Sequence, residues 1–160
     1  MPDYIVMTDS SCDLPAEVAE QFEIPALPLS TQIEGKTYRN YIDGSGVDIQ
    51  WFYARLREKQ PATTSAVNMQ DFTAAMEPIL QSGRDILYLG FSSALSSTYE
   101  AGAMAAAELA PKYPERKIFT VDTLCASLGQ GLLVYLTAQE RARGCTIEEA
   151  RDFAERTKLH

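Results

Sequence analysis

Histidine is almost absent from this 160-residue chain, in which His160, the last residue, is the only one. A Ser-His catalytic relay and a histidine metal site both need an imidazole beside other side chains, so the sequence favours neither. The three cysteines, Cys12, Cys125 and Cys145, are odd in number and share no short spacing. They match neither a disulfide framework nor a zinc cluster. The sequence therefore indicates reduced thiols, a cytoplasmic location, and neither a cofactor nor a metal site.

Basic clusters and long apolar runs are also missing. The formal net charge is −8, and lysine and arginine never form a run longer than a pair. A nucleic-acid-binding surface needs a basic footprint that releases counterions, so we expect no nucleic-acid partner. No apolar run approaches the ~18 residues that span a bilayer, and no basic segment followed by an apolar stretch marks a secretory signal. We therefore expect neither a transmembrane segment nor a leader.

What is present is an alternation of apolar strands and helix patterns. The hydrophobic and charged fractions, 46% and 22%, are typical of a globular chain, and the length fits one domain. The order of elements predicts an α/β fold with a mostly parallel central sheet, helices on both faces, and a β-hairpin excursion around Glu34-Gly35. Expected strands cover residues 4–8, 27–33, 36–41, 86–90 and 117–121, and helices begin near Asp13, Asp48, Asn68, Ser97, Cys125 and Thr146.

Hydroxyl side chains gather where three of the expected strands end. These loops follow Thr8, Gly90 and Val121, and each leads into a helix. In an open parallel sheet, the loops at the carboxyl ends of the strands line one crevice, where ligands bind. A helix N-terminus also favours an anion, through its free N–H groups and its dipole. The sequence thus predicts a crevice of Ser, Thr, Asp and backbone N–H that holds a small anionic group without transforming it.

Individual residues in these loops have two readings. Ser92–Thr98 carries five hydroxyls in seven residues, more than the capping box Ser97-Thr-Tyr-Glu100 needs, so others are free for a ligand. Thr63-Thr64-Ser65, taken alone, is typical of hydroxyls that satisfy backbone groups in an extended or looped segment. Asp9 and Asp122 fit either a nucleophile or metal ligand, or a carboxylate that accepts N–H bonds from a neighbouring loop.

Apolar stripes at helical spacing predict core faces. One alternative is that the small residues Ala101, Ala103 and Ala105 leave room for a thin apolar ligand. The pair Gly129 and Gly131 fits a phosphate loop weakly, and fits close helix packing or the passage of a ligand chain equally well. The stripes are Phe72, Met76, Ile79 and Leu80; Leu128, Leu132, Leu133 and Leu136; and Met104 with Leu109.

Four motifs, in this order, resemble the DegV family over residues 4 to about 156: Ile5–Pro15, Thr64-Ser65, Ser92–Tyr99 and Val121–Leu132. The resemblance implies a fatty-acid-binding protein that is not itself an enzyme. In some bacteria such a protein is the lipid-presenting subunit of a fatty acid kinase, so a kinase subunit is an expected partner. The family's carboxylate contacts carry over to Thr64 and to Ser96 or Ser93, with Ser65, Ser10 and Thr98 as further ligand-binding candidates.

The chain departs from the family pattern in two loops and in length. Ala66-Val67-Asn68 stands where Gln-Pro-Ser is common, and Ser96-Ser97-Thr98 replaces Ser-Gly-Thr. Family members usually carry a second α/β domain over the ligand, so residues 1–160 resemble the N-terminal domain alone. Two rivals to a fatty acid carrier stay open: an enzyme that uses Asp9 or Asp122 for phosphoryl or acyl transfer, and an interaction module without a ligand.

Overall fold

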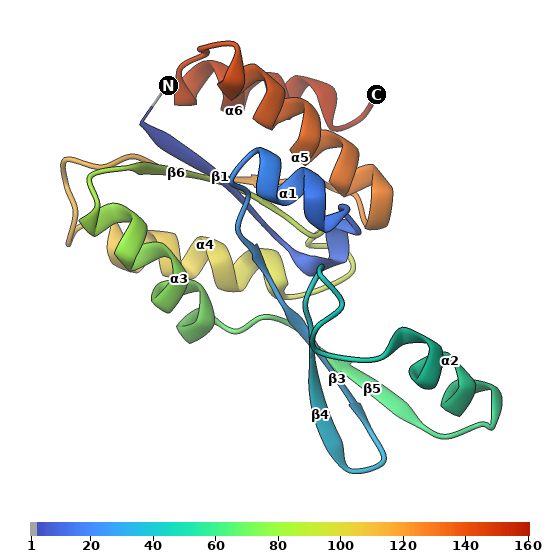
Figure 1. The fold of residues 1–160 in the computed structure, drawn as a ribbon. Coiled ribbons are helices and arrows are strands. Elements are labelled where there is room, and N and C mark those ends of the chain that lie inside the picture. The colour runs from blue at the N-terminus through green and yellow to red at the C-terminus, as the bar shows by residue number, and fades with distance from the viewer. Residues whose placement is uncertain (1–2) are drawn as a thin grey trace.

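The fold is built on a four-stranded parallel sheet, seen in a computed structural model that describes residues 3–160 (Figure 1). The strands lie in the order β2-β1-β6-β7. All three pairings are parallel, with Val6 beside Leu87 and Leu87 beside Phe119. The expected mostly parallel sheet is confirmed. Its strands are β1 (Tyr4–Asp9), β2 (Ala26–Leu27), β6 (Asp85–Gly90) and β7 (Ile118–Asp122).

Helices cover both faces of this sheet, as the alternation of elements predicts (Figure 1). Successive side chains of β1 point to opposite faces, so Val6 joins one apolar cluster and Met7 the other. One face packs against α1 (Ala16–Gln21), α5 (Ser127–Ala142) and α6 (Ile147–Thr157). The other packs against α3 (Met69–Gln81) and α4 (Thr98–Leu109). No helix within residues 3–160 is long and apolar enough to cross a membrane.

Some of the helix caps expected from the sequence are present, and two are not. Asp48 and Asn68 cap their helices through Trp51 N and Asp71 N, and Thr146 forms the expected capping box with Glu149. The capping box expected at Ser97 is wrong, because Ser97 makes no side-chain cap bond. The cap expected at Asp13 is also wrong, since α1 starts after Pro15. Pro78 lies inside α3, which continues to Gln81.

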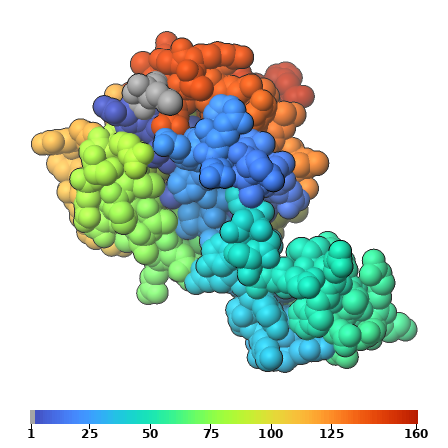
Figure 2. Space-filling view, viewed as in Figure 1, coloured from blue at the N-terminus to red at the C-terminus, as the bar shows by residue number. Residues whose placement is uncertain are grey.

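The β-hairpin excursion is larger than the sequence predicts. β3 (Leu29–Ile33) pairs antiparallel with β4 (Lys36–Asn40) around Glu34-Gly35, as expected. A third strand, β5 (Ala62–Ser65), pairs with the other edge of β3 where an extended or looped segment was expected. Together with α2 (Ile49–Arg57), these strands form a projection that we call the arm, residues 29–66. The other described residues are the body, and Figure 2 shows the arm, coloured cyan to green, standing out from it.

The apolar stripes divide between core and surface. Phe72, Met76 and Leu80 are buried, whereas Met104 is 58% exposed. A Cβ on Gly102 would lie 2.5 Å from the Tyr88 ring, so the small residues of α4 bring that helix against the sheet. At Gly102 this packing leaves no room for a thin ligand between the helix and the ring.

The stripe on α5 is divided in the same way. Leu133 is buried as expected, but Leu128 and Leu132 are 65% and 58% exposed. These two leucines line an open apolar groove of ≈ 450 Å³ between α1 and α5, together with Leu14, Val18 and Tyr135.

Candidate functional site

Three hydroxyl-bearing loops meet at the carboxyl end of the parallel sheet. They are the 3-10 turn Ser10–Cys12 after β1, residues 91–97 after β6, and residues 123–126 after β7. Phe91 N donates to the Asp9 carboxylate at 2.9 Å, which joins the first two loops. Ser92 N donates to the Cys125 carbonyl at 3.0 Å, which joins the second and third. The three loops therefore lie together at one end of the sheet, as predicted.

Asp9 holds this edge together from beneath. Its buried carboxylate accepts five hydrogen bonds, from Phe91 N, the Tyr88 hydroxyl at 3.1 Å, Gln130 Nε2 at 3.3 Å, and the amide and hydroxyl of Ser11. Burial, and then the Asp9 charge, raise the pKa of Tyr88 well above its usual value, so the phenol stays protonated as a donor. Five donors fill the about four lone-pair sites of a carboxylate. The hydrogen bonds to Asp9 therefore support the second interpretation, a structural carboxylate that accepts from neighbouring loops.

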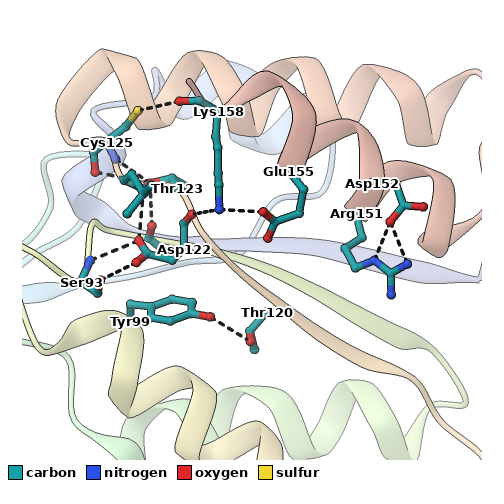
Figure 3. Close-up of polar contacts among 12 residues, drawn as sticks. Ser93, Tyr99, Thr120, Asp122, Thr123, Cys125, Arg151, Asp152, Glu155 and Lys158 are labelled. Carbon is teal, nitrogen blue, oxygen red and sulfur yellow. Dashed lines mark hydrogen bonds and ion pairs between the residues drawn. The ribbon is translucent and has the colours of Figure 1, made fainter. Parts of the chain in front are cut away.

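Asp122 plays a similar part on the other side of β6 (Figure 3). Its carboxylate accepts from Ser93 N at 3.2 Å, from Leu124 N at 3.1 Å, and from the Ser93 hydroxyl. Its backbone carbonyl accepts from Lys158 Nζ at 3.1 Å. The hydroxyl of Ser93 is therefore already engaged, and Asp122 is occupied by its own loop and by its neighbour.

Ser96 and Thr98 stand at the start of α4. The Ser96 hydroxyl accepts from Thr98 N at 3.2 Å and lies 2.9 Å from the Thr98 hydroxyl. Thr98 is buried, whereas Ser96 is half-buried. Ser97 provides no side-chain cap, and the Ser96 hydroxyl already caps the first N–H of α4, that of Thr98. The N–H groups of the first turn that follow Thr98 keep their capacity to bind an anion.

Ser10 joins the crevice to the arm. Its buried hydroxyl accepts from Leu29 N at 3.0 Å, at the first residue of β3. Ser30, the next residue, pairs with Ser65, and one step further along the two strands Thr31 pairs with Thr64. Thr64 and Ser65 are both exposed. Across residues 3–160 no hydrogen bond joins Thr64 or Ser65 to the β6 loop, so two of the predicted ligand contacts lie on the arm and the others on the body.

One organising residue in α5, Gln130, was not recognised from the sequence. Gln130 is fully buried, where its amide donates to Thr8 Oγ1 at 3.1 Å and its carbonyl oxygen lies 2.8 Å from Ser11 Oγ. A Cβ on Gly131 would lie 2.3 Å from the Cys12 carbonyl oxygen, so close helix packing explains this glycine. A polar residue between two glycines on an apolar helix face was the available signal.

Lys158 is a cation at the β7 loop that sequence reasoning also missed. The sequence pattern assigns no contact to the residues that follow the last helix. Instead, the last turn after α6 returns to the loop, and Lys158 is 16% exposed at its side chain. No local pattern announces this contact, because 36 residues separate Lys158 from Asp122.

The thiols show little sign of chemistry. Cys12 is buried, and burial raises the pKa of its thiol to about 11, so it stays protonated at neutral pH and is a poor nucleophile. Within residues 3–160, no group of three or more His, Cys, Asp or Glu side chains could hold a metal ion. What the described site offers is hydroxyl and amide donors at the edge of a parallel sheet.

This combination defines a class: an α/β domain whose parallel strands end in loops that carry hydroxyl and amide hydrogen-bond donors. A family model described as "Uncharacterised protein, DegV family" matches residues 4–160. The chain belongs to the DegV family. A DegV domain-containing protein of Clostridium perfringens is 42% identical over 158 residues, which cover 99% of this chain and 54% of that protein. A Streptococcus pyogenes relative is 30% identical over 95% of this chain and 53% of its own length.

Solved structures agree in fold. A fatty-acid-binding DegV family protein from Thermus thermophilus matches with a TM-score of 0.86 at 27% identity, over 98% of this chain and 54% of that one. DegV of Bacillus subtilis, a fatty acid binding protein, matches with a TM-score of 0.86 at 25% identity, over 99% and 55%. The chain thus spans about half the length of the relatives that it matches.

Proposed function

We propose that this chain binds a long-chain fatty acid without covalent chemistry, with the carboxylate at the hydroxyl crevice. The observation that supports the proposal is the β6 loop, where the Ser96 hydroxyl and the first-turn N–H groups of α4 beyond Thr98 are neutral donors suited to one anion. Donors of this kind hold a carboxylate without transforming it. The two solved relatives described above bind fatty acids, which supports the same ligand class for this chain.

The head group is assigned to Ser96 and Thr64. Ser93 is the weaker alternative, because its hydroxyl already donates to Asp122. Ser10 and Thr98 are buried and hydrogen-bonded, so they shape the site from behind. Ser65 lies next to Thr64 and faces the other side of the arm sheet, toward Ser30.

The acyl chain needs apolar surface beside the head group. Leu95 in the β6 loop is 67% exposed, and Leu124 in the β7 loop is 47% exposed. Each buried methylene stabilises binding by about 0.8 kcal/mol, so covering such side chains with a tail is favourable. The exposed leucines suit the acyl chain of a fatty acid, and the hydroxyl donors beside them suit its carboxylate.

The wider role is that of a carrier that presents the fatty acid to a separate kinase subunit in the cytoplasm. The Asp9 carboxylate is filled by donors, the Asp122 carboxylate is bonded to its own loop and to Ser93, and the Cys12 thiol is protonated. These observations support a carrier over a phosphoryl- or acyl-transfer enzyme. Since the chain spans about half of each relative, the kinase partner, the location and the identity of residues 1–160 as the N-terminal domain are parts of this proposal.

Native mass spectrometry after mild purification tests the proposal. A co-purifying long-chain fatty acid, or its uptake on titration, supports the carrier. Turnover of ATP or acyl phosphate would instead support the enzyme that uses Asp9 or Asp122. A chain that stays empty at saturating fatty acid would support an interaction module and overturn the carrier.

A further inference from the structure

Ser96 owes its position to a turn that is anchored at its other end. Ser96 N and Leu95 N both donate to the Ser92 carbonyl, at 3.1 and 3.0 Å. Ser93, the next residue, is fixed to the Asp122 carboxylate by its amide and its hydroxyl. The turn therefore has one firm end at Ser92 and Ser93, and this end sets where the Ser96 hydroxyl points.

Asp122 is in turn held by the end of α6 (Figure 3). Lys158 Nζ donates to the Asp122 carbonyl at 3.1 Å and pairs with Glu155 at 2.6 Å. The Lys158 carbonyl accepts from Cys125 Sγ at 3.6 Å. A largely buried ammonium is costly unless it is paired, and here both partners are supplied. Lys158 thus contacts the β7 loop on both sides of Leu124, at Asp122 and at Cys125. The φ of Leu124, 54°, is the left-handed conformation.

We propose that Asp122 and Lys158 are positioning residues for the fatty acid carboxylate. Lys158 fixes the β7 loop, Asp122 fixes Ser93, and the turn from Ser92 sets Ser96 in place. Neither residue contacts the ligand. A carboxylate suits the middle position because it only accepts, so it can take the amide and the hydroxyl of Ser93 together. This inference rests on the proposed fatty acid binding and adds the residues that hold its donor loop.

The first test substitutes Asp122→Asn, which replaces one acceptor oxygen by a donor. We expect the dissociation constant for a long-chain fatty acid to rise about 10-fold, because a misplaced Ser96 loses a hydrogen bond to a charged group. The dissociation constant for the matched alcohol should change much less. Asp43→Asn is the control, since Asp43 accepts from Ser45 N at 2.9 Å in a similar turn on the arm. An equal loss for acid and alcohol would indicate general damage and overturn the proposal.

A double-mutant cycle separates anchoring from direct contact. If Ser93 acts only through Asp122, then Ser93→Ala should weaken fatty acid binding in the unsubstituted chain and add little in the Asp122→Asn background. If Ser93 contacts the carboxylate itself, the two losses should multiply. Multiplying losses would overturn the positioning role of Asp122.

Amide hydrogen exchange tests the same link without a ligand. Asp122→Asn and Lys158→Met should both speed exchange at residues 91–98, whereas Lys112→Met, which breaks the exposed pair with Glu108, should not. Lys158→Met leaves the Asp122 carboxylate intact, so it covers the case in which Asp122→Asn fails to fold. Unchanged exchange in both variants overturns the positioning role alone. If the unsubstituted chain binds no fatty acid, the proposed function falls and the positioning role falls with it.

Discussion

The body and the arm are stabilised by different interactions, although one chain passes through both. In the body, apolar clusters lie on both faces of the parallel sheet, and every residue of β1 is buried. In the arm, which the structure describes throughout, the buried residues are Ile33 and Val47, and no residue of α2 is buried. The arm depends on strand pairing and on half-buried aromatic contacts, such as Tyr38 with Trp51 at 5.6 Å between ring centroids.

This difference bears directly on binding, because the proposed donors come from both regions. Thr64 lies on β5 of the arm, and Ser96 lies on a loop that is fixed to the body. Segments with few buried apolar contacts open more easily than the core. A carboxylate held by both residues would therefore order the arm against the body, and part of the binding free energy would be spent on that ordering.

The largest expected effect is the loss of a core phenylalanine. Phe72→Ala in the body should lower the free energy of unfolding by about 3–5 kcal/mol, because Phe72 is fully buried. Phe52→Ala on the half-buried α2 should cost no more than about half of that. Denaturant titration with Cys12 alkylation as the body probe and Trp51 fluorescence as the arm probe measures both. Equal losses, or coincident transitions in the unsubstituted chain, would show that the arm shares the stability of the body.

The head group gives the next largest effect. Thr64→Ala on the arm and Ser96→Ala on the body should each raise the dissociation constant for fatty acid by about 10- to 100-fold, since a hydrogen bond to a charged group is worth roughly 1.5–3 kcal/mol. Binding of the matched alcohol should change much less. Ser97→Ala is the control, because Ser97 makes no side-chain cap bond. If neither variant affects fatty acid affinity, the head group lies elsewhere.

The pH dependence of the unfolding free energy should distinguish the body from the arm by a smaller amount. Burial raises the pKa of Cys12 from 9.0 to about 11, so above pH 9 the unfolded chain loses this proton while the folded body keeps it. Body stability should therefore be full below pH 9 and decline as the pH rises toward 11. Tyr88, whose pKa burial also raises, adds to the decline. Unfolding curves for Cys12→Ala should show a shallower decline, and an unchanged slope would contradict the assignment.

The smallest effect concerns the ion pair between the regions. Arg39 on β4 pairs with Asp71 on α3 at 2.9 Å, and both side chains are substantially exposed. Arg39→Gln should therefore lower arm stability by less than about 1 kcal/mol, and added salt should shrink the difference further. The Trp51 fluorescence transition reports it. A loss as large as that of Phe72→Ala would mean that the pair is the main attachment of the arm.

The sequence predicts the features that depend on neighbouring residues. Asp48, Asn68 and Thr146 cap helices through amides three residues away, and the apolar runs of β1 and β6 define the parallel sheet. β5 was not recognised because Ala62–Ser65 carries no apolar alternation and its partner lies about 30 residues earlier. Most of the candidate site was visible as hydroxyl loops. Gln130 and Lys158 were missed as its supports because they are brought there only by tertiary packing.

The groove between α1 and α5 has a practical consequence for the assays. Leu128 and Leu132 present apolar surface in this open groove of ≈ 450 Å³, whose lining does not include the head-group donors. Detergents, fluorescent lipid analogues and environment-sensitive dyes should partition there as well as into the crevice. Titrations with such amphiphiles should show a second, weaker class of site that Ser96→Ala and Thr64→Ala do not alter. A polar replacement at Leu132 should remove that class and improve recovery of the protein at high concentration.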